Sequence, residues 1–362
     1  MKNIAFKIFI SVLLLCLIAT IATSCVSDQN NLVSNYDNSL QNQNESISTK
    51  ENISGNEDIW TDRKLTVGYI TPGALTSWYT TLAKNIVDTA KEWNINLIHY
   101  DSEGKHDLQI EQVRLLINKK VDVIAICAGI LTGWDEVLNE AQQAGIPIIL
   151  IQHGINVTDK TLYSTYIEID NYEQGNKAGE HLIRYLKNND KSNSNIRIVE
   201  MRANDDAVDI LKIGEAFREV IKDFDNLDII ESLNGWYTGQ PAYEKMKEYL
   251  ITNKEINVLF SQGDEMTEAA IQAIEETGLV PGEDILIISV DGSDKILEYI
   301  VGGKVLCSVE RNPRFGPLLM EACVRLANGE EIEREIHPVD RVFDITNAQA
   351  ELDAREENGY GY

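Results

Sequence analysis

Polar side chains stand at the ends of several apolar segments in this chain. Gln152 and His153 directly follow the apolar run 146–151, and Asp291 follows another such run in the sequence SVDGSD. Asp205 stands in a loop after a third run. Amide, imidazole and carboxylate groups offer directional hydrogen-bond donors and acceptors. These side chains therefore predict a site that binds the polar groups of a small ligand.

The segment 121–153 indicates how such side chains are positioned. It reads VDVIAICAGILTGWDEVLNEAQQAGIPIILIQH, with an apolar run near each end and an amphipathic helical pattern between them. Continuous apolar runs of this length are typical of parallel strands, which are buried on both faces. Parallel strands need a helical crossover, and ligands bind beyond their carboxyl ends. Gln152 and His153 lie at such an end.

Strand and helix patterns alternate through the rest of the chain in two sets. The first set starts at Leu65, and the second starts near Tyr163 and ends in a helix from Asn347. A chain of 362 residues with 43% hydrophobic residues can bury the cores of two domains. We therefore predict an α/β fold with two doubly wound lobes.

Two local patterns add detail to this prediction. Asn171, with Gln174 three residues later, predicts a reciprocal capping box at the start of a helix. The segment Pro338–Asp344 predicts a strand near the end of the second set.

Composition and motifs exclude several classes of function. The formal net charge of −26 argues against nucleic acid as a partner. The chain has no GxSxG elbow, no Walker loop, and no GxGxxG after its first strand. Its histidines and cysteines lack metal-ligand spacing, and Cys127, Cys307 and Cys323 predict buried free thiols. We therefore expect neither an enzyme nor a cofactor or metal site.

The first 58 residues predict export and attachment. Residues 1–24 have the charged start and apolar core of a signal peptide. The sequence Ala22-Thr23-Ser24-Cys25 resembles a bacterial lipobox, which predicts lipidation of Cys25, although Ala22 stands where a larger aliphatic residue is usual. Ordinary secretion is the alternative. The remainder of residues 25–58 is polar and predicts a disordered tether.

The order of the elements resembles that of bacterial periplasmic sugar-binding proteins of the ribose-binding type, the substrate receptors of ABC importers. The resemblance extends from Leu65 to Val342. It rests on VGYI, VDVIAI, AGIPIIL, IEIDNYEQGNKAG, SQGDEMTEAAIQAIEETG and ISVDGSDKILEYIVGGKV, in that order. TGWDEVLNEAQQAGIPI followed by VTDKTLYSTYIEIDN looks most like the galactofuranose-binding branch.

The resemblance implies the periplasmic binding protein type I fold, in which two Rossmann-like lobes are joined by a three-strand hinge. We place the crossings near Glu168–Ile169, Glu310–Arg311 and Pro338–Asp340. The implied lobe boundaries are 59–168 plus 311–338 for the N-terminal lobe and 169–310 plus 339–362 for the C-terminal lobe.

The resemblance also implies ligand-binding residues. The family's aromatic pair falls on Trp78 and Tyr79, and its later aromatic residue falls on Trp236. Its acid in the DG turn falls on Asp291, and its polar residue before the late proline falls on Arg311.

Three other positions depart from the family pattern. The chain has Gln152-His153 where an Asp-Arg pair is usual, Ile213 where an Arg is usual, and Gly263 where an Asn is usual.

A sugar has apolar C–H faces and a rim of hydroxyls, so its site needs aromatic rings and polar side chains together. Trp78 and Trp236 fit the first requirement, whereas a tryptophan in a helix stripe usually packs in the core. Asp291 also suits a turn, and Arg311 also suits an ion pair with Glu310. Asp205 and its neighbour Asp206 also suit a solvated turn.

We therefore expect a monomeric, lipid-anchored receptor outside the cytoplasm, which delivers a small sugar to the membrane permease of an ABC importer. The sugar would resemble galactofuranose, galactose or ribose. The alternative is a sensor of a sugar, nucleoside or autoinducer that partners a membrane histidine kinase or a chemoreceptor.

Overall fold

The structure is a computed structural model that describes residues 64–73, 77–203, 208–252 and 255–362. Cys25 and the predicted signal peptide and tether lie outside the described residues, and so do Asp205 and Asp206. No helix among the described residues is long and apolar enough to cross a membrane.

The first lobe is built on a six-stranded parallel sheet with the order β11-β5-β4-β3-β1-β2. Its strands are β1 (Thr66–Thr71), β2 (Asn96–Asp101), β3 (Val123–Ile126), β4 (Ile148–Ile151), β5 (Thr165–Ile167) and β11 (Glu335–Ile336). Its helices are α2 (Ser77–Glu92), α3 (His106–Asn118), α4 (Asp135–Gln143) and α10 (Gly316–Ala327), with a short 3₁₀ helix at Lys160–Leu162. Every residue of β3 and β4 is buried, as expected for parallel strands covered on both faces.

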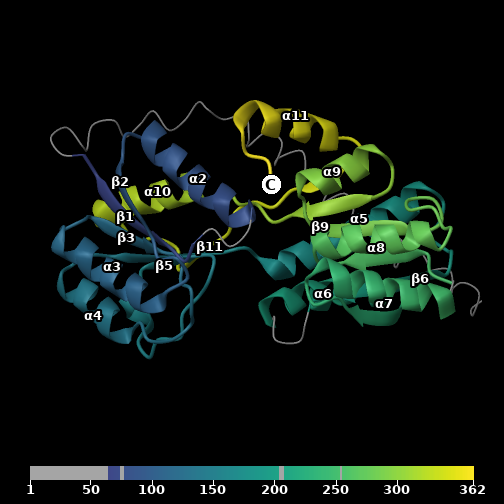
Figure 1. Ribbon diagram of the computed structural model, residues 1–362, viewed down its shortest axis with the longest axis horizontal. Helices are drawn as coiled ribbons and strands as arrows, with labels where there is room; N and C mark the ends of the chain where they lie inside the picture. Colours follow the sequence, from purple (N-terminus) through teal and green to yellow (C-terminus); the bar gives the residue numbers. More distant parts are fainter. Residues whose placement is uncertain (1–63, 74–76, 204–207, 253–254) are drawn as a thin grey trace, which may run out of the picture. The chain divides into compact units, whose positions relative to one another are not determined.

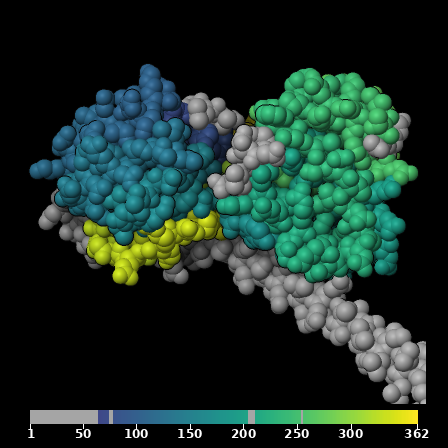
Figure 2. Space-filling model, turned by 90° about the horizontal axis from the view of Figure 1, so that it is seen from below, coloured from purple at the N-terminus to yellow at the C-terminus, as the bar shows by residue number. Residues whose placement is uncertain are grey.

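Helices cover both faces of this sheet. Figure 1 shows α2 and α10 on one face and α3 and α4 on the other. Helix α10 comes late in the sequence and nevertheless packs on α2, so the chain returns to the first lobe after building most of the second. In the space-filling view, late residues coloured yellow accordingly lie on the blue surface of the first lobe (Figure 2).

The second lobe is built on a six-stranded sheet with the order β12-β10-β9-β8-β6-β7, in which only the β10–β12 pair is antiparallel. Its strands are β6 (Ile196–Arg202), β7 (Leu227–Asn234), β8 (Val258–Ser261), β9 (Leu286–Asp291), β10 (Cys307–Glu310) and β12 (Val342–Asp344). Its helices are α5 (Asn171–Asn188), α6 (Val208–Ile221), α7 (Gly239–Thr252), α8 (Asp264–Glu276), α9 (Asp294–Val301) and α11 (Ala348–Asn358). The predicted α/β fold with two doubly wound lobes is therefore confirmed.

The chain passes between the two sheets three times. It leaves the first sheet after β5, returns after β10, and leaves again between β11 and β12. The prediction of one strand at Pro338–Asp344 is wrong, because β11 and β12 belong to different sheets and residues 337–341 connect them. Pro338, which has no N–H to donate to a sheet, lies in this connection.

The predicted capping box at Asn171 is also wrong. Asp170 is the N-cap, and its carboxylate accepts hydrogen bonds from the N–H groups of Tyr172 and Glu173. Gln174 instead donates its side-chain amide to the Glu310 carbonyl (3.1 Å) and to Asp340 Oδ2 (3.2 Å). The Gln174 side chain therefore binds residues that are distant in the sequence, and not the start of its own helix at Asn171. Cys127, Cys307 and Cys323 are buried free thiols, as predicted.

Candidate functional site

Several predicted site residues lie beyond the carboxyl ends of strands. Trp78 and Tyr79 open α2 after β1, and Gln152 and His153 follow β4. Asp291 ends β9, Arg311 follows β10, and Trp236 follows β7. Among these residues, direct contacts join Trp78 to Arg311, Arg311 to Asp291, and Tyr79 to His153.

Tyr79 and His153 form a polar pair in the first lobe. The Tyr79 hydroxyl and His153 Nε2 share a hydrogen bond, and the two ring centroids lie 6.1 Å apart. Burial raises the pKa of Tyr79 above its ordinary value, so this hydroxyl keeps its proton. The family resemblance implies an aromatic ring and an arginine at these two positions.

Gln152 presents an unused acceptor beside this pair. Its backbone is in the left-handed region (φ 63°), held by a hydrogen bond from its N–H to the Ile167 carbonyl (2.8 Å) and one from the Tyr166 hydroxyl to its own carbonyl (2.9 Å). Its side-chain Oε1 is buried and has no hydrogen-bond partner among the described residues. A buried acceptor left unpaired costs about 1–3 kcal/mol, so a ligand hydroxyl there would stabilise it.

Asp291 and Arg311 are connected through a tyrosine that the sequence analysis missed. The Tyr237 hydroxyl donates to both carboxylate oxygens of Asp291 (3.0 and 3.1 Å) and accepts from Arg311 Nη1 (3.2 Å). Arg311 Nε lies 3.7 Å from Asp291 Oδ1. The Arg311 carbonyl accepts the Trp78 indole N–H at 2.7 Å, so the cluster reaches the aromatic start of α2.

Trp236 and Tyr237 are consecutive residues of a strained turn after β7. Both residues have left-handed backbones (φ 57° and 58°), which non-glycine residues rarely adopt. Trp236 is 59% exposed, whereas Tyr237 reaches the buried polar cluster. The alternative that Trp236 packs in the core is therefore wrong. No described contact joins its side chain to the other predicted site residues.

Two of the three departures from the family pattern now have a structural basis. Ile213 is fully buried in the apolar core of the second lobe, so a polar contact is absent from that position. A Cβ atom at Gly263 would lie 2.8 Å from Tyr237 Cε2. Glycine at this position therefore makes room for the Tyr237 ring.

The carboxyl group of Asp264 belongs to a residue that contacts Asp291, since the Asp264 N–H donates to Asp291 Oδ2 (3.2 Å). Asp264 is buried and accepts hydrogen bonds from Ser289 Oγ (2.7 Å) and from the Ser293 N–H (2.6 Å). Burial, and then the nearby charge of Asp291, raise the pKa of Asp264 to about 8. Burial raises the pKa of Asp291 as well, and the nearby Arg311 guanidinium opposes this rise. The described residues contain no group of three acidic, histidine or cysteine side chains that could hold a metal ion.

Comparison with known proteins places this chain in a family of binding proteins. The family model described as a periplasmic binding protein domain matches residues 67–331. The galactofuranose-binding protein YtfQ of Escherichia coli is 30% identical over 300 residues, which cover 82% of this chain and 93% of that protein.

Two solved structures are similarly related. One, from Mycobacterium smegmatis in complex with β-D-fucofuranose, is 33% identical with a TM-score of 0.66, over 81% of this chain and 96% of the other. The other is the binding protein of an arabinose ABC transporter from Shewanella sp. ANA-3, bound to α- and β-L-arabinofuranose. It is 32% identical with a TM-score of 0.68, again over 81% and 96%.

The packing of Tyr237 on Gly263 yields a prediction about stability. Gly263→Ala should lower the free energy of unfolding by about 1–3 kcal/mol, because the added methyl group overlaps the Tyr237 ring. In a Tyr237→Ala background the steric part of this loss should disappear. The cost of alanine at the N-cap of α8 is present in both backgrounds and cancels. Urea unfolding of the four proteins measures the difference.

Gly239→Ala is the matched control, since a Cβ there would meet its nearest atom at an ordinary 3.8 Å. An equal loss from Gly263→Ala with and without the Tyr237 ring would contradict the packing argument.

Proposed function

Because this chain belongs to the periplasmic binding protein family, we propose that it captures a sugar in its furanose form and delivers it to a membrane importer. Membership in this family makes the chain a binding protein that works outside the cytoplasm, and not an enzyme. The observation that carries the choice of ligand is the set of relatives. Their names include galactofuranose, fucofuranose and arabinofuranose, all sugars with a five-membered ring.

The side chains of the candidate site suit such a ligand. Asp291 accepts from sugar hydroxyls, and Arg311 donates to them. Gln152 supplies a further acceptor, which has no partner among the described residues. Trp78 offers an aromatic ring to the C–H face of the sugar, and Tyr79 with His153 provides a polar edge in the same lobe.

Binding works through the two lobes in this proposal. We assign residues 59–168 plus 311–338 to the N-terminal lobe and residues 169–310 plus 339–362 to the C-terminal lobe. A ligand that contacts both lobes favours the conformation in which they are closed around it. The closed form is then the one that the importer's permease recognises. The protein acts as a monomer.

We also propose attachment to the membrane, which the sequence of residues 1–58 supports. A lipid on Cys25 and the polar tether after it would hold the receptor near the permease while leaving it free to turn. Capture and delivery would then take place at the same membrane surface.

The two tryptophans provide a test of the site. Trp78→Ala and Trp236→Ala should each weaken the binding of a furanose by about 1–3 kcal/mol, or roughly 5- to 150-fold in Kd, because stacking and burial are lost. Isothermal titration with galactofuranose and arabinofuranose measures this change. Trp93→Phe, just beyond the far end of α2, is the control and should leave Kd unchanged. Unchanged affinity in both alanine variants would remove these residues from the site.

The lipid anchor makes a separate prediction. Cys25→Ala should move the protein from the membrane fraction of the producing cells to the soluble extracytoplasmic fraction, because the acylated side chain is absent. Immunoblots of the two fractions show this directly. The proposal fails if the unaltered protein is already soluble.

A further inference from the structure

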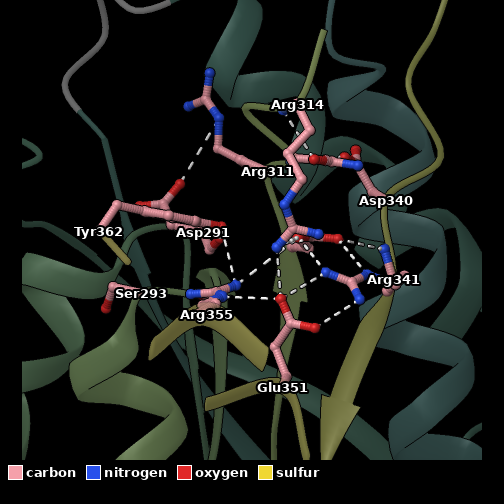
Figure 3. A network of polar contacts seen from close by, with 12 residues as sticks. Asp291, Ser293, Arg311, Arg314, Asp340, Arg341, Glu351, Arg355 and Tyr362 are labelled. Carbon is pink, nitrogen blue, oxygen red and sulfur yellow. Dashed lines mark hydrogen bonds and ion pairs between the residues drawn. The ribbon is translucent and has the colours of Figure 1, made fainter. Parts of the chain in front are cut away.

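Helix α11 and the segment 359–362 form hydrogen bonds with the turn after β9, which carries Asp291. The Tyr362 hydroxyl donates to the Asp291 carbonyl (3.0 Å), and the Asp294 N–H donates to the Tyr362 carbonyl (2.8 Å). Arg355 Nη1 donates to the Gly292 carbonyl and to Asp294 Oδ1, both at 2.8 Å. These contacts fix the turn at three of its four residues. Figure 3 shows Tyr362 and Arg355 next to Asp291.

The Asp291 backbone needs such support. Its φ of 117° is unusual for a residue with a side chain, and such conformations persist only where the surroundings hold them. Two donors meet at its carbonyl oxygen, the Tyr362 hydroxyl and the Arg311 N–H, each at 3.0 Å. The direction of the Asp291 carboxylate, towards Tyr237 and Arg311, depends on this backbone conformation.

Tyr362 is itself fixed in place. The Arg355 guanidinium stacks 4.5 Å from the centre of its ring, and Arg355 is 2% exposed and pairs with Glu351 (2.9 Å). A Cβ atom at Gly361 would lie 2.2 Å from Asp294 Oδ2, so glycine lets the segment approach the turn closely.

The same segment also contacts the first lobe. Thr81 Oγ1 donates to the Gly361 carbonyl (3.3 Å), and Lys84 Nζ lies 4.4 Å from the centre of the Tyr360 ring. Both residues belong to α2, the helix that begins with Trp78 and Tyr79. Residues 359–362 therefore contact an element of each lobe that carries predicted ligand contacts, and they lie outside the family match at 67–331.

We propose that Tyr362 is a positioning residue for ligand binding, whose hydroxyl holds the Asp291 carbonyl so that the Asp291 carboxylate faces the ligand. Tyr362 acts through Asp291 and does not touch the ligand. This inference rests on the proposed function, because it assigns Asp291 to the sugar site.

The test compares two tyrosines of the same segment in the full-length protein. Tyr362→Phe removes the hydroxyl that reaches Asp291. Tyr360→Phe removes a hydroxyl that has no hydrogen-bond partner among the described residues, so it is the matched control. We expect Tyr362→Phe to weaken furanose binding about threefold to tenfold, the usual range for one hydrogen bond, and Tyr360→Phe to leave Kd unchanged.

A second measurement separates positioning from general destabilisation and needs no ligand. Amide hydrogen exchange in the ligand-free protein should accelerate at residues 291–294 and at Arg311 in Tyr362→Phe, and not in Tyr360→Phe. The melting temperatures of the two variants should agree closely.

Unchanged exchange in Tyr362→Phe would overturn the proposal, and so would faster exchange with undiminished affinity. If the unaltered protein binds no furanose, the proposed function fails, and exchange at the turn still decides whether Tyr362 holds Asp291.

Discussion

The buried carboxylate of Glu310 is the constraint on which the connection between the lobes depends. Glu310 is fully buried at the end of β10, where the chain leaves the second sheet. Arg341 donates to it through Nε and Nη2, both at 2.8 Å, and guanidinium nitrogens of Arg314 and Arg355 lie 3.8 Å away. Such a charge is very costly to bury unless it is paired, so these residues must assemble together.

A second carboxylate completes this network. Glu351 of α11 binds the same three arginines at 2.6–2.9 Å (Figure 3). Arg314 stands in the second crossing and Arg341 at the end of the third. Gln174, which follows the first crossing, donates to the Glu310 carbonyl. Residues at or beside all three crossings therefore meet at Glu310, which links their conformations.

The network is directly continuous with the candidate site. Glu310 pairs with Asp291 across β9 and β10, and Arg311 follows it in the chain. Arg355 of the network donates to the Gly292 carbonyl in the same turn. A ligand that binds Asp291 and Arg311 would therefore act on residues next to the crossings, where a small change in backbone angle moves a whole lobe. Asp291 and Arg311 would therefore take part both in ligand recognition and in lobe movement.

The sequence was sufficient for features that repeat locally, and the family resemblance is confirmed. Apolar runs such as 146–151 predicted buried parallel strands because burial on both faces leaves a continuous pattern. Gln152, His153 and Asp291 were predicted to bind ligand because each lies at the carboxyl end of a predicted strand. The contact of Trp78 with Arg311 joins residues 233 positions apart, and only the resemblance had suggested both.

Other features depend on geometry that local patterns do not record. Trp236 and Tyr237 are adjacent aromatic residues, and only the backbone of their turn decides that Tyr237 enters the polar cluster. One signal in the sequence pointed to the position of the Tyr237 ring. It was Gly263, which stands where the family resemblance implies an Asn. The partners of Gln174 and Tyr362 are distant in sequence. The local pattern therefore predicts a capping box at Gln174, and it predicts no contact for Tyr362.

A thermal-shift screen measures whether this protein binds a furanose. The protein is first freed of co-purified ligand and then heated with galactofuranose, arabinofuranose, galactopyranose, ribose and nucleosides. A ligand at about 100 times its Kd stabilises the folded state by about 2.7 kcal/mol, which shifts the melting temperature clearly. A furanose should raise the melting temperature strongly. A shift only with a nucleoside or a pyranose, or none at all, would contradict the proposed function.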